Sequence, residues 1–367
     1  MRNDRHGTMS GIAALTLLLA AGCSGGAGGA NGGLGGLTPK NELSRSVSDL
    51  QNHNALTATL AVDATAADLV AASRVGGSAS SGMTAQQAAL IAGASISFEL
   101  KAPAGKTLAQ ISGTNGGAVD VIVHLDGADV VEFRIVGGSV YVHTDAPKIV
   151  QILGKPASVL TNLENQLPPA FSFVRAAIQG QWLSVSKADA GALVQRFGAA
   201  ASPNPAQRQA FITTLRNALL DNVTVTRSGS TSAGDHLVLT GSVRTIVSGV
   251  FDAYRSMLGN NPLFSRFSKT QIPDRDVALD AYVQGGSLSQ LSLNLLQFAP
   301  ASQAAALAGK HIAASVSLLT SGADINAPGS STPLNLTALL AGLSGIFGSG
   351  ASNSSSVTAT AAPLTGG

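Results

Sequence analysis

The chain has a single cysteine, Cys23, among its 367 residues. One thiol cannot form a disulfide within the chain, so the fold must be held together by burial and hydrogen bonds. Aromatic residues make up 4% and charged residues 11%, whereas charged residues usually approach about 25%. The net charge is +2 and no basic run occurs, which excludes the electrostatic pattern of a nucleic-acid-binding protein.

The first 22 residues have the layout of a secretory signal peptide. A basic start is followed by an apolar run from about Gly11 to Ala21. As a helix this run would rise about 16 Å, roughly half of a bilayer core, so it is too short for a stable span. Small residues, Ala20 to Gly22, stand directly before Cys23. This pattern resembles the bacterial lipobox, although Leu19 lies one place earlier than the family usually has it.

The lipobox resemblance implies that Cys23 carries a diacylglycerol and becomes the first residue of the mature protein. The acyl chains would anchor the protein on the extracytoplasmic face of a cell membrane. Residues 23–40 are then the modified cysteine and a Gly-rich linker, which reaches roughly 22 Å as a flexible coil. The alternative is an ordinary signal peptide with an unmodified cysteine.

Residues 41–330 read as one α+β domain with an antiparallel sheet. Period-two alternation predicts strands at 55–62 and 96–100, then three in succession over 119–125, 131–136 and 139–144. Further strands are expected at 181–186, 222–227, 236–244, 277–286, 287–298 and 311–319.

Helical patterns occur between these strands. They predict helices at 41–51 with Asn41 as N-cap, near 84–91, after Pro147, at 158–167, at 206–220 and at 245–259. Residues 331–367 hold a short apolar helix, 334–347, and a Ser/Thr-rich low-complexity end that we expect to be disordered. Alanine and glycine are abundant, which suggests a GC-rich, actinobacterial source.

Several stretches of this domain resemble actinobacterial LppX/LprG-type lipoproteins and, more distantly, LolA-like lipoprotein carriers. They are the lipobox and linker, the hairpin "VEFRIVGGSVYVHTD" followed by a helix and "GQWLSVS", the late hairpin "DAYVQGGSLSQLSLNLLQF", and the closing strand "HIAASVSLLTSGADINAPG". The resemblance covers roughly residues 42–330 as an order of elements, with extra helical segments near 145–180 and 245–270. It implies a strongly curved antiparallel half-barrel covered by helices, and lipid carriage in the space between.

The composition is compatible with such a cavity. Few bulky aromatics are available to fill a core, so Val, Leu, Ile and Ala on a wide sheet could leave room for alkyl chains. A plain, filled core is the equal alternative, and it would favour a structural or protein-binding surface lipoprotein. The candidate lining residues are Leu125, Phe133, Ile135, Leu239, Leu291, Leu293 and Leu295. Trp182 either packs in the core or lies at a cavity mouth.

The catalytic patterns are weak, and we expect neither an enzyme nor a cofactor. "GCSGG" at 22–26 matches a nucleophile elbow but lies in the lipobox. "SVSK" at 184–187 lacks the accompanying motifs of the serine enzymes that use it. His124 and His143 fall in neighbouring predicted strands, but without a third ligand exposed histidines are the simpler interpretation than a metal site. Asp120 and Asp126, beside His124, are expected on a solvent-facing side.

Overall fold

The computed structural model describes residues 37–75, 82–111, 117–168, 171–190, 221–258, 272, 274–322 and 324–334. Within this part of the chain one sheet of 12 strands runs in the order β12-β6-β5-β4-β3-β2-β1-β11-β10-β9-β8-β7. Neighbouring strands are antiparallel except β12 and β6, which are parallel. The strands are β1 Ala55–Ala64, β2 Ala94–Lys101, β3 Ala118–Leu125, β4 Ala128–Val136, β5 Ser139–Thr144, β6 Leu183–Val185, β7 Thr224–Thr231, β8 Gly234–Ser242, β9 Asp276–Gln284, β10 Ser287–Asn294, β11 Ile312–Leu319 and β12 Thr332–Pro333.

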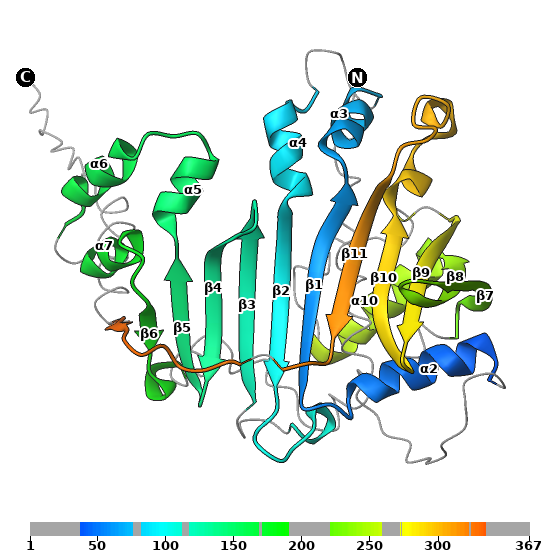
Figure 1. Ribbon diagram of the computed structural model, residues 1–367, viewed down its shortest axis with the longest axis horizontal. Helices are drawn as coiled ribbons and strands as arrows, with labels where there is room; N and C mark the ends of the chain where they lie inside the picture. Colours follow the sequence, from blue (N-terminus) through cyan, green and yellow to red (C-terminus); the bar gives the residue numbers. More distant parts are fainter. Residues whose placement is uncertain are drawn as a thin grey trace, which may run out of the picture.

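Helices lie at the ends and sides of this sheet (Figure 1). In the described ranges they are α2 Pro39–Leu50, α3 Ala66–Val75, α4 Ala85–Ala92, α5 Ala146–Ile152, α6 Ser158–Gln166, α7 Ser172–Ile178 and α10 Val243–Leu258. Short 3-10 turns occur at Leu108–Gln110, Leu295–Phe298 and Ala301–Gln303. None of the described helices is long and apolar enough to cross a bilayer.

The N-cap of α2 differs from the sequence-based expectation by about a turn, whereas that of α4 agrees with it. Thr38, not Asn41, caps α2: its hydroxyl accepts a hydrogen bond from the Asn41 amide, and Pro39 occupies the first turn, where a missing N–H costs nothing. For α4 the expected Thr84 cap is confirmed, with Gln87 completing a capping box. The predicted helix 206–220 and the C-terminal helix 334–347 lie outside the described residues, apart from Leu334.

The register divides the sheet into an apolar and a polar face. Residues paired across antiparallel strands point to the same side, so Leu60, Ile96 and Val123 share one face while Thr59, Ser97 and Ile122 share the other. The apolar face is continuous from β6 to β8, and its central members are Leu56, Ala58, Leu60, Phe98, Val121, Phe133, Val142, Val316, Leu291, Ala281 and Leu237.

In the half of the sheet from β1 to β8 the apolar face is packed shut. Helix α2 contacts β10 and β7 and places Leu43 and Leu50 in a buried cluster with Leu237, Leu291 and other strand residues. An ion pair between the buried Glu42 of α2 and the exposed Arg227 of β7 holds the helix against this end of the sheet. This half therefore has a filled core.

The sheet is open and not strongly curled, so the expected half-barrel curvature is not what the structure has. In Figure 1 strands β1 to β6 stand side by side, and the sheet turns away from the viewer only toward β7 and β8. Bends in sheets come from bulges. The pairings of β1 with β2 and β11, and of β2 with β3, run without a register shift. Shifts occur only farther out, at Val123/His124, Arg227/Gly229 and Leu288/Gln290.

A C-terminal segment, residues 324–334, crosses the polar face, and we call it the strap. It leads from β11 past the ends of the neighbouring strands to β6 (Figure 1). Asp324 pairs with Lys101 of β2 at 3.0 Å, and the Asn326 carbonyl accepts from Arg134 of β4 at 3.0 Å. At its far end the Thr332 amide donates to the Trp182 carbonyl at 2.7 Å. The sheet therefore continues past residue 330, the domain boundary expected from the sequence.

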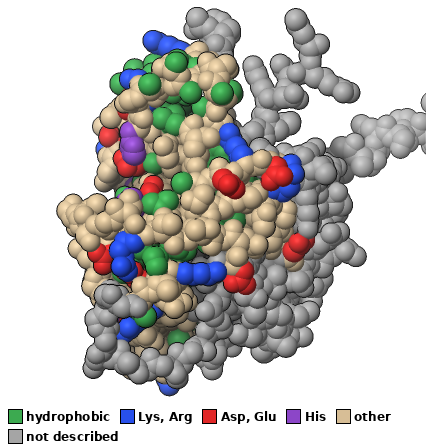
Figure 2. All heavy atoms as spheres, turned by 90° about the vertical axis from the view of Figure 1, so that its right-hand side faces the viewer, with side chains coloured by type: hydrophobic (Ala, Val, Ile, Leu, Met, Phe, Trp, Pro, Cys, Tyr) green, Lys and Arg blue, Asp and Glu red, His purple; other side chains and the backbone are tan. Residues whose placement is uncertain are grey.

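Charged side chains are interspersed on the surface toward the β7 edge. Figure 2 shows acidic and basic groups on that side singly or in small groups of mixed sign. This distribution agrees with the low net charge of the sequence.

Candidate functional site

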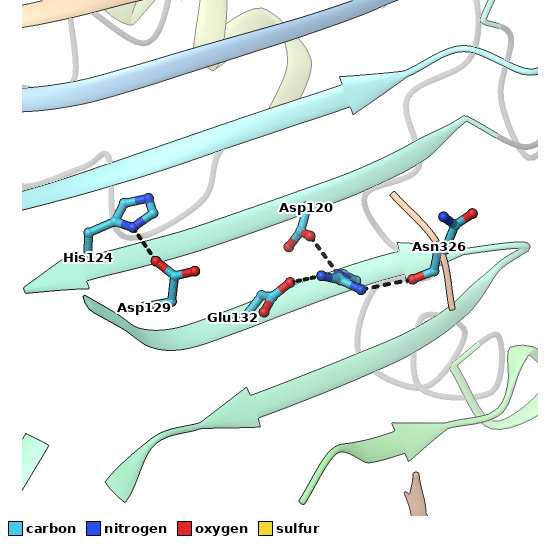
Figure 3. A network of polar contacts seen from close by, with 6 residues as sticks. Asp120, His124, Asp129, Glu132 and Asn326 are labelled. Carbon is cyan, nitrogen blue, oxygen red and sulfur yellow. Dashed lines mark hydrogen bonds and ion pairs between the residues drawn. The ribbon is translucent and has the colours of Figure 1, made fainter. Parts of the chain in front are cut away.

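A cluster of charged residues lies beneath the strap on the polar face (Figure 3). Arg134 donates from Nε to Asp120 Oδ2 at 2.6 Å, forms an ion pair through Nη2 with Glu132, and donates from Nη1 to the Asn326 carbonyl. Its guanidinium also lies 4.9 Å from the centre of the Trp182 ring. The cation thus links two carboxylates, an aromatic ring and the strap.

The two carboxylates of this cluster are buried, which corrects the expectation that Asp120 faces solvent. The side chain of Asp120 is 3% exposed and that of Glu132 is 11% exposed. Alternation correctly placed these residues on the polar face, but the strap and the neighbouring side chains cover that face here. Asp126, by contrast, is exposed in the turn after β3.

Burial and a shared negative charge change the acidity of the cluster. Burial, together with the hydrogen bond and the charge of Asp120, raises the pKa of Glu132 to about 7. Burial, followed by the charge of Asp120, also raises the pKa of Glu99 on β2. At neutral pH this site therefore holds a carboxyl group that can gain or lose a proton.

A second chain of hydrogen bonds adjoins the cluster on the same face. His124 Nδ1 lies 2.6 Å from Asp129 Oδ1, and His124 Nε2 lies 2.9 Å from Ser97 Oγ. The Ser97 hydroxyl is in turn 3.0 Å from Thr59 Oγ1. With its proton on Nδ1, the imidazole donates to Asp129 and accepts from Ser97. This order of groups is that of a Ser-His-Asp triad.

The surroundings of Ser97 do not suit nucleophilic catalysis. The residue is 6% exposed and lies in the middle of β2. Strand β2 is paired on both sides, with β1 and with β3, so its backbone N–H groups are used in the sheet and cannot form an oxyanion hole. The Asp129–His124–Ser97 chain thus gives hydrogen-bond partners to the buried Ser97 and the partly buried His124.

The two histidines singled out in the sequence do not come together. His124 lies on β3 and His143 on β5, with β4 between them; Glu132 of β4 is the residue opposite His143. His143 instead packs against Trp182, with ring centroids 5.1 Å apart. Among the described residues no group of three or more His, Cys, Asp or Glu side chains is arranged to hold a metal ion. Because Trp182 contacts His143 and Arg134, which both lie on the polar face, Trp182 lies on that face as well. It is half-buried.

The register places the strand members of the predicted cavity lining on one face, the apolar face, but in two different settings. Leu239, Leu291 and Leu293 are 5%, 0% and 7% exposed and belong to the filled core. Leu295, in the 3-10 turn after β10, packs against the same core. The remaining three, Leu125, Phe133 and Ile135, lie on β3 and β4, outside that core cluster.

The apolar face of β3 to β5 is more open than that of the other half. Phe133 is 37% exposed, and the remaining apolar residues on this face are only partly buried: Val119, Val121, Val123, Leu125, Val131, Ile135, Val140 and Val142. An exposed phenylalanine among eight aliphatic side chains makes this an apolar surface large enough to contact an alkyl chain.

Of the remaining sequence motifs, those before residue 37 lie outside the described residues and the "SVSK" match lies within them. Cys23, the lipobox, the "GCSGG" match and the Gly-rich linker through residue 36 lie outside the described residues. Ser184 of the "SVSK" match lies on β6, where its hydroxyl accepts from Ser331 of the strap at 2.9 Å. It serves the contact between strap and sheet.

Comparison with solved structures finds matches with low TM-scores and low sequence identity. The chain is similar to two mycobacterial lipoproteins. One is the Mycobacterium tuberculosis lipoprotein LppX, with a TM-score of 0.30 and 9% identity over 78% of this chain and 98% of that chain. The other is LprF from Mycobacterium bovis, with a TM-score of 0.32 and 8% identity over 80% of this chain and 97% of that chain.

These two likenesses are distant. No protein-family profile matches the chain, and no curated protein matches it in sequence. Scores at this level leave family and function unassigned, so a functional argument has to come from the chain's own residues.

Proposed function

We propose that the chain is a membrane-anchored cell-envelope lipoprotein that binds a lipid or a lipidated molecule on the apolar face of β3 to β5. The observation that carries the proposal is the contrast between the two halves of that face. Helix α2 seals one half, whereas Phe133 and its aliphatic neighbours stay partly exposed. An acyl chain laid along this surface would bury area worth about 25 cal/mol per Å². No catalytic step is part of the proposal.

The anchor rests on the lipobox-like residues before Cys23. Each buried CH₂ group contributes about 0.8 kcal/mol, so two acyl chains suffice for stable attachment. We expect Cys23→Ala to release the mature chain from the membrane fraction of an expressing bacterium into the soluble envelope fraction. Fractionation followed by immunoblotting measures this, and Ser24→Ala is the control because it leaves the thiol in place. A Cys23→Ala product that sediments with membranes like the wild type would disprove the lipid anchor.

Acyl binding can be tested with the chain from residue 24 onward, which contains every described residue. We expect a fluorescent palmitate analogue to bind it, and Phe133→Ser to weaken that binding at least about tenfold, since a large apolar contact is worth about 1.5–3 kcal/mol. Fluorescence titration gives the dissociation constants, and native mass spectrometry shows whether a lipid co-purifies.

The matched control is Leu163→Ser, which removes an apolar side chain 44% exposed on α6, away from the sheet face. It should leave palmitate binding unchanged. Equal loss in both variants, or no uptake and no co-purifying lipid in the wild type, would contradict the lipid-binding proposal. That result would favour the alternative, a structural or protein-binding lipoprotein with a filled core.

A further inference from the structure

The charge balance beneath the strap depends on a single proton. Arg134 supplies one positive charge to two buried carboxylates, those of Asp120 and Glu132. If both acids are ionised, the group carries a net charge of −1 where it is shielded from water, and this is costly. If one proton is retained, the group is neutral.

An oxygen atom of Asp120 that has no hydrogen-bond partner indicates which carboxyl group carries this proton. Asp120 Oδ1 is buried without a hydrogen-bond partner among the described residues. The Glu132 carboxyl is within hydrogen-bonding reach of Asp120. A proton on Glu132 gives Asp120 Oδ1 a donor and removes the excess charge in the same step. This explains why Glu132 holds its proton up to a pH of about 7.

The strap is connected to the same group. Arg134 Nη1 donates to the Asn326 carbonyl, and Asp324, two residues before it, pairs with Lys101. Ile325 between them is 4% exposed, so this part of the strap lies tightly against the protein. Lifting it would admit water to Arg134 and to both carboxylates.

We propose that the Asp120–Glu132 carboxyl pair is a proton-controlled lock on the strap: the strap lies on the polar face while the pair shares a proton, and loss of that proton loosens it. The closed form retains the proton more strongly than a hydrated, open form does. By linkage, the open form gains population as the pH rises through about 7, by up to about tenfold per pH unit for one proton. This inference does not depend on lipid binding.

Other titratable and charged groups face the pair from the surrounding elements. They are Glu99 and Lys101 of β2, His124 of β3, Asp129 of β4, Tyr141 and His143 of β5, and Asp324 of the strap. His143 is the main rival, because it lies directly opposite Glu132 and contacts Trp182, and because an imidazole is a common proton-binding group in proteins.

Trp182 offers a direct readout. It is the only tryptophan, it lies beside Arg134, and its carbonyl accepts a hydrogen bond from the strap. In the chain from residue 24 onward, we expect acrylamide quenching of Trp182 to rise with a single-proton transition near pH 7. Glu132→Gln mimics the protonated acid and should abolish the transition, leaving quenching low at pH 8. His143→Gln should retain it.

A second measurement, made on the wild type, tests the proposal even if Glu132→Gln folds poorly. In the wild type, hydrogen-exchange protection of peptides spanning residues 324–334, corrected for intrinsic rates, should fall as the pH rises toward about 7, the pKa of Glu132, and level off above it. Asp324→Asn, which removes only an exposed ion pair, should lower protection at every pH and keep the pH dependence. The proposal is overturned if wild-type protection is constant between pH 6 and 8, or if the Trp182 transition is lost in His143→Gln and kept in Glu132→Gln.

Discussion

Replacing Arg134 with methionine should destabilise the protein by about 3–5 kcal/mol at pH 8, because it leaves two buried carboxylates without a cation. The Asp120 side chain is 3% and the Glu132 side chain 11% exposed, so water cannot take over the role of the guanidinium. Methionine keeps much of the side-chain volume, so most of the loss is electrostatic. Urea unfolding followed by circular dichroism measures the change.

The loss should shrink at acidic pH, and the sign follows from linkage. Arg134 lowers the pKa of Glu132, which burial raises, so without Arg134 the folded-state pKa of Glu132 rises further above its unfolded value. The folded form then binds the proton more strongly and is relatively favoured at low pH. This contribution is present below the unfolded pKa of Glu132 and disappears as the pH rises through its folded-state pKa. Equal destabilisation at pH 5 and pH 8 would contradict this account.

Arg244→Met is the matched control for this experiment. Arg244 pairs with Asp274 at 2.9 Å, but the two side chains are 41% and 64% exposed. An exposed pair of this kind contributes about 0–1 kcal/mol. A comparable loss in the two variants would mean that burial of the Asp120–Glu132 pair is not the cause.

Leu291→Ala should cost about 2–5 kcal/mol, since it opens a cavity in the centre of the filled half of the sheet. Leu291 is 0% exposed and lies in the cluster formed by α2 and the strands from β1 to β8. Thermal and urea unfolding of the purified variant measure the loss. Leu163→Ala, at a site 44% exposed, should stay within about 0.5 kcal/mol of the wild type.

A comparison of Phe133→Ala with Leu291→Ala tests how the two halves of the apolar face differ. Phe133→Ala should cost much less stability than Leu291→Ala, because a residue 37% exposed leaves no closed cavity. If instead Leu291→Ala were nearly neutral, the β1–β8 half would not be a packed core, and the division on which the lipid-binding proposal rests would fail.

Alternation of apolar and polar residues predicted the central strands well, because these strands turn one face to a core or an apolar surface. The segment 55–62 and the three strands over 119–144 appear as β1 and β3 to β5, within two or three residues at their ends. Helix α3 was missed because its Ala- and Ser-rich sequence has little amphipathic contrast and buries only Leu69. Strand 236–244 was extended too far, since α10 begins at Val243.

The polar cluster was only half visible in the sequence. Period two placed Asp120 on a polar face. His124 and His143 were assigned to neighbouring strands, whereas β4 lies between the strands that carry them. What local pattern could not supply was burial. The strap that covers Arg134 lies nearly two hundred positions later in the chain, where Asn326 makes the contact. The residues around Asp120 in the sequence do not indicate that this contact exists. Contacts of such long range depend on the whole topology.

The position of β1 has a consequence for biogenesis. Thr57 near the beginning of the sheet is paired with Leu319 near its end. The middle of the sheet therefore cannot close until β11 has emerged, and assembly that depends on such distant pairing is slow. A chain that ends before Ile312, where β11 begins, would leave one side of β1 unpaired and open to aggregation. Late closure would suit the export that we propose for this chain, because an exported polypeptide is threaded through a narrow translocation pore before it folds.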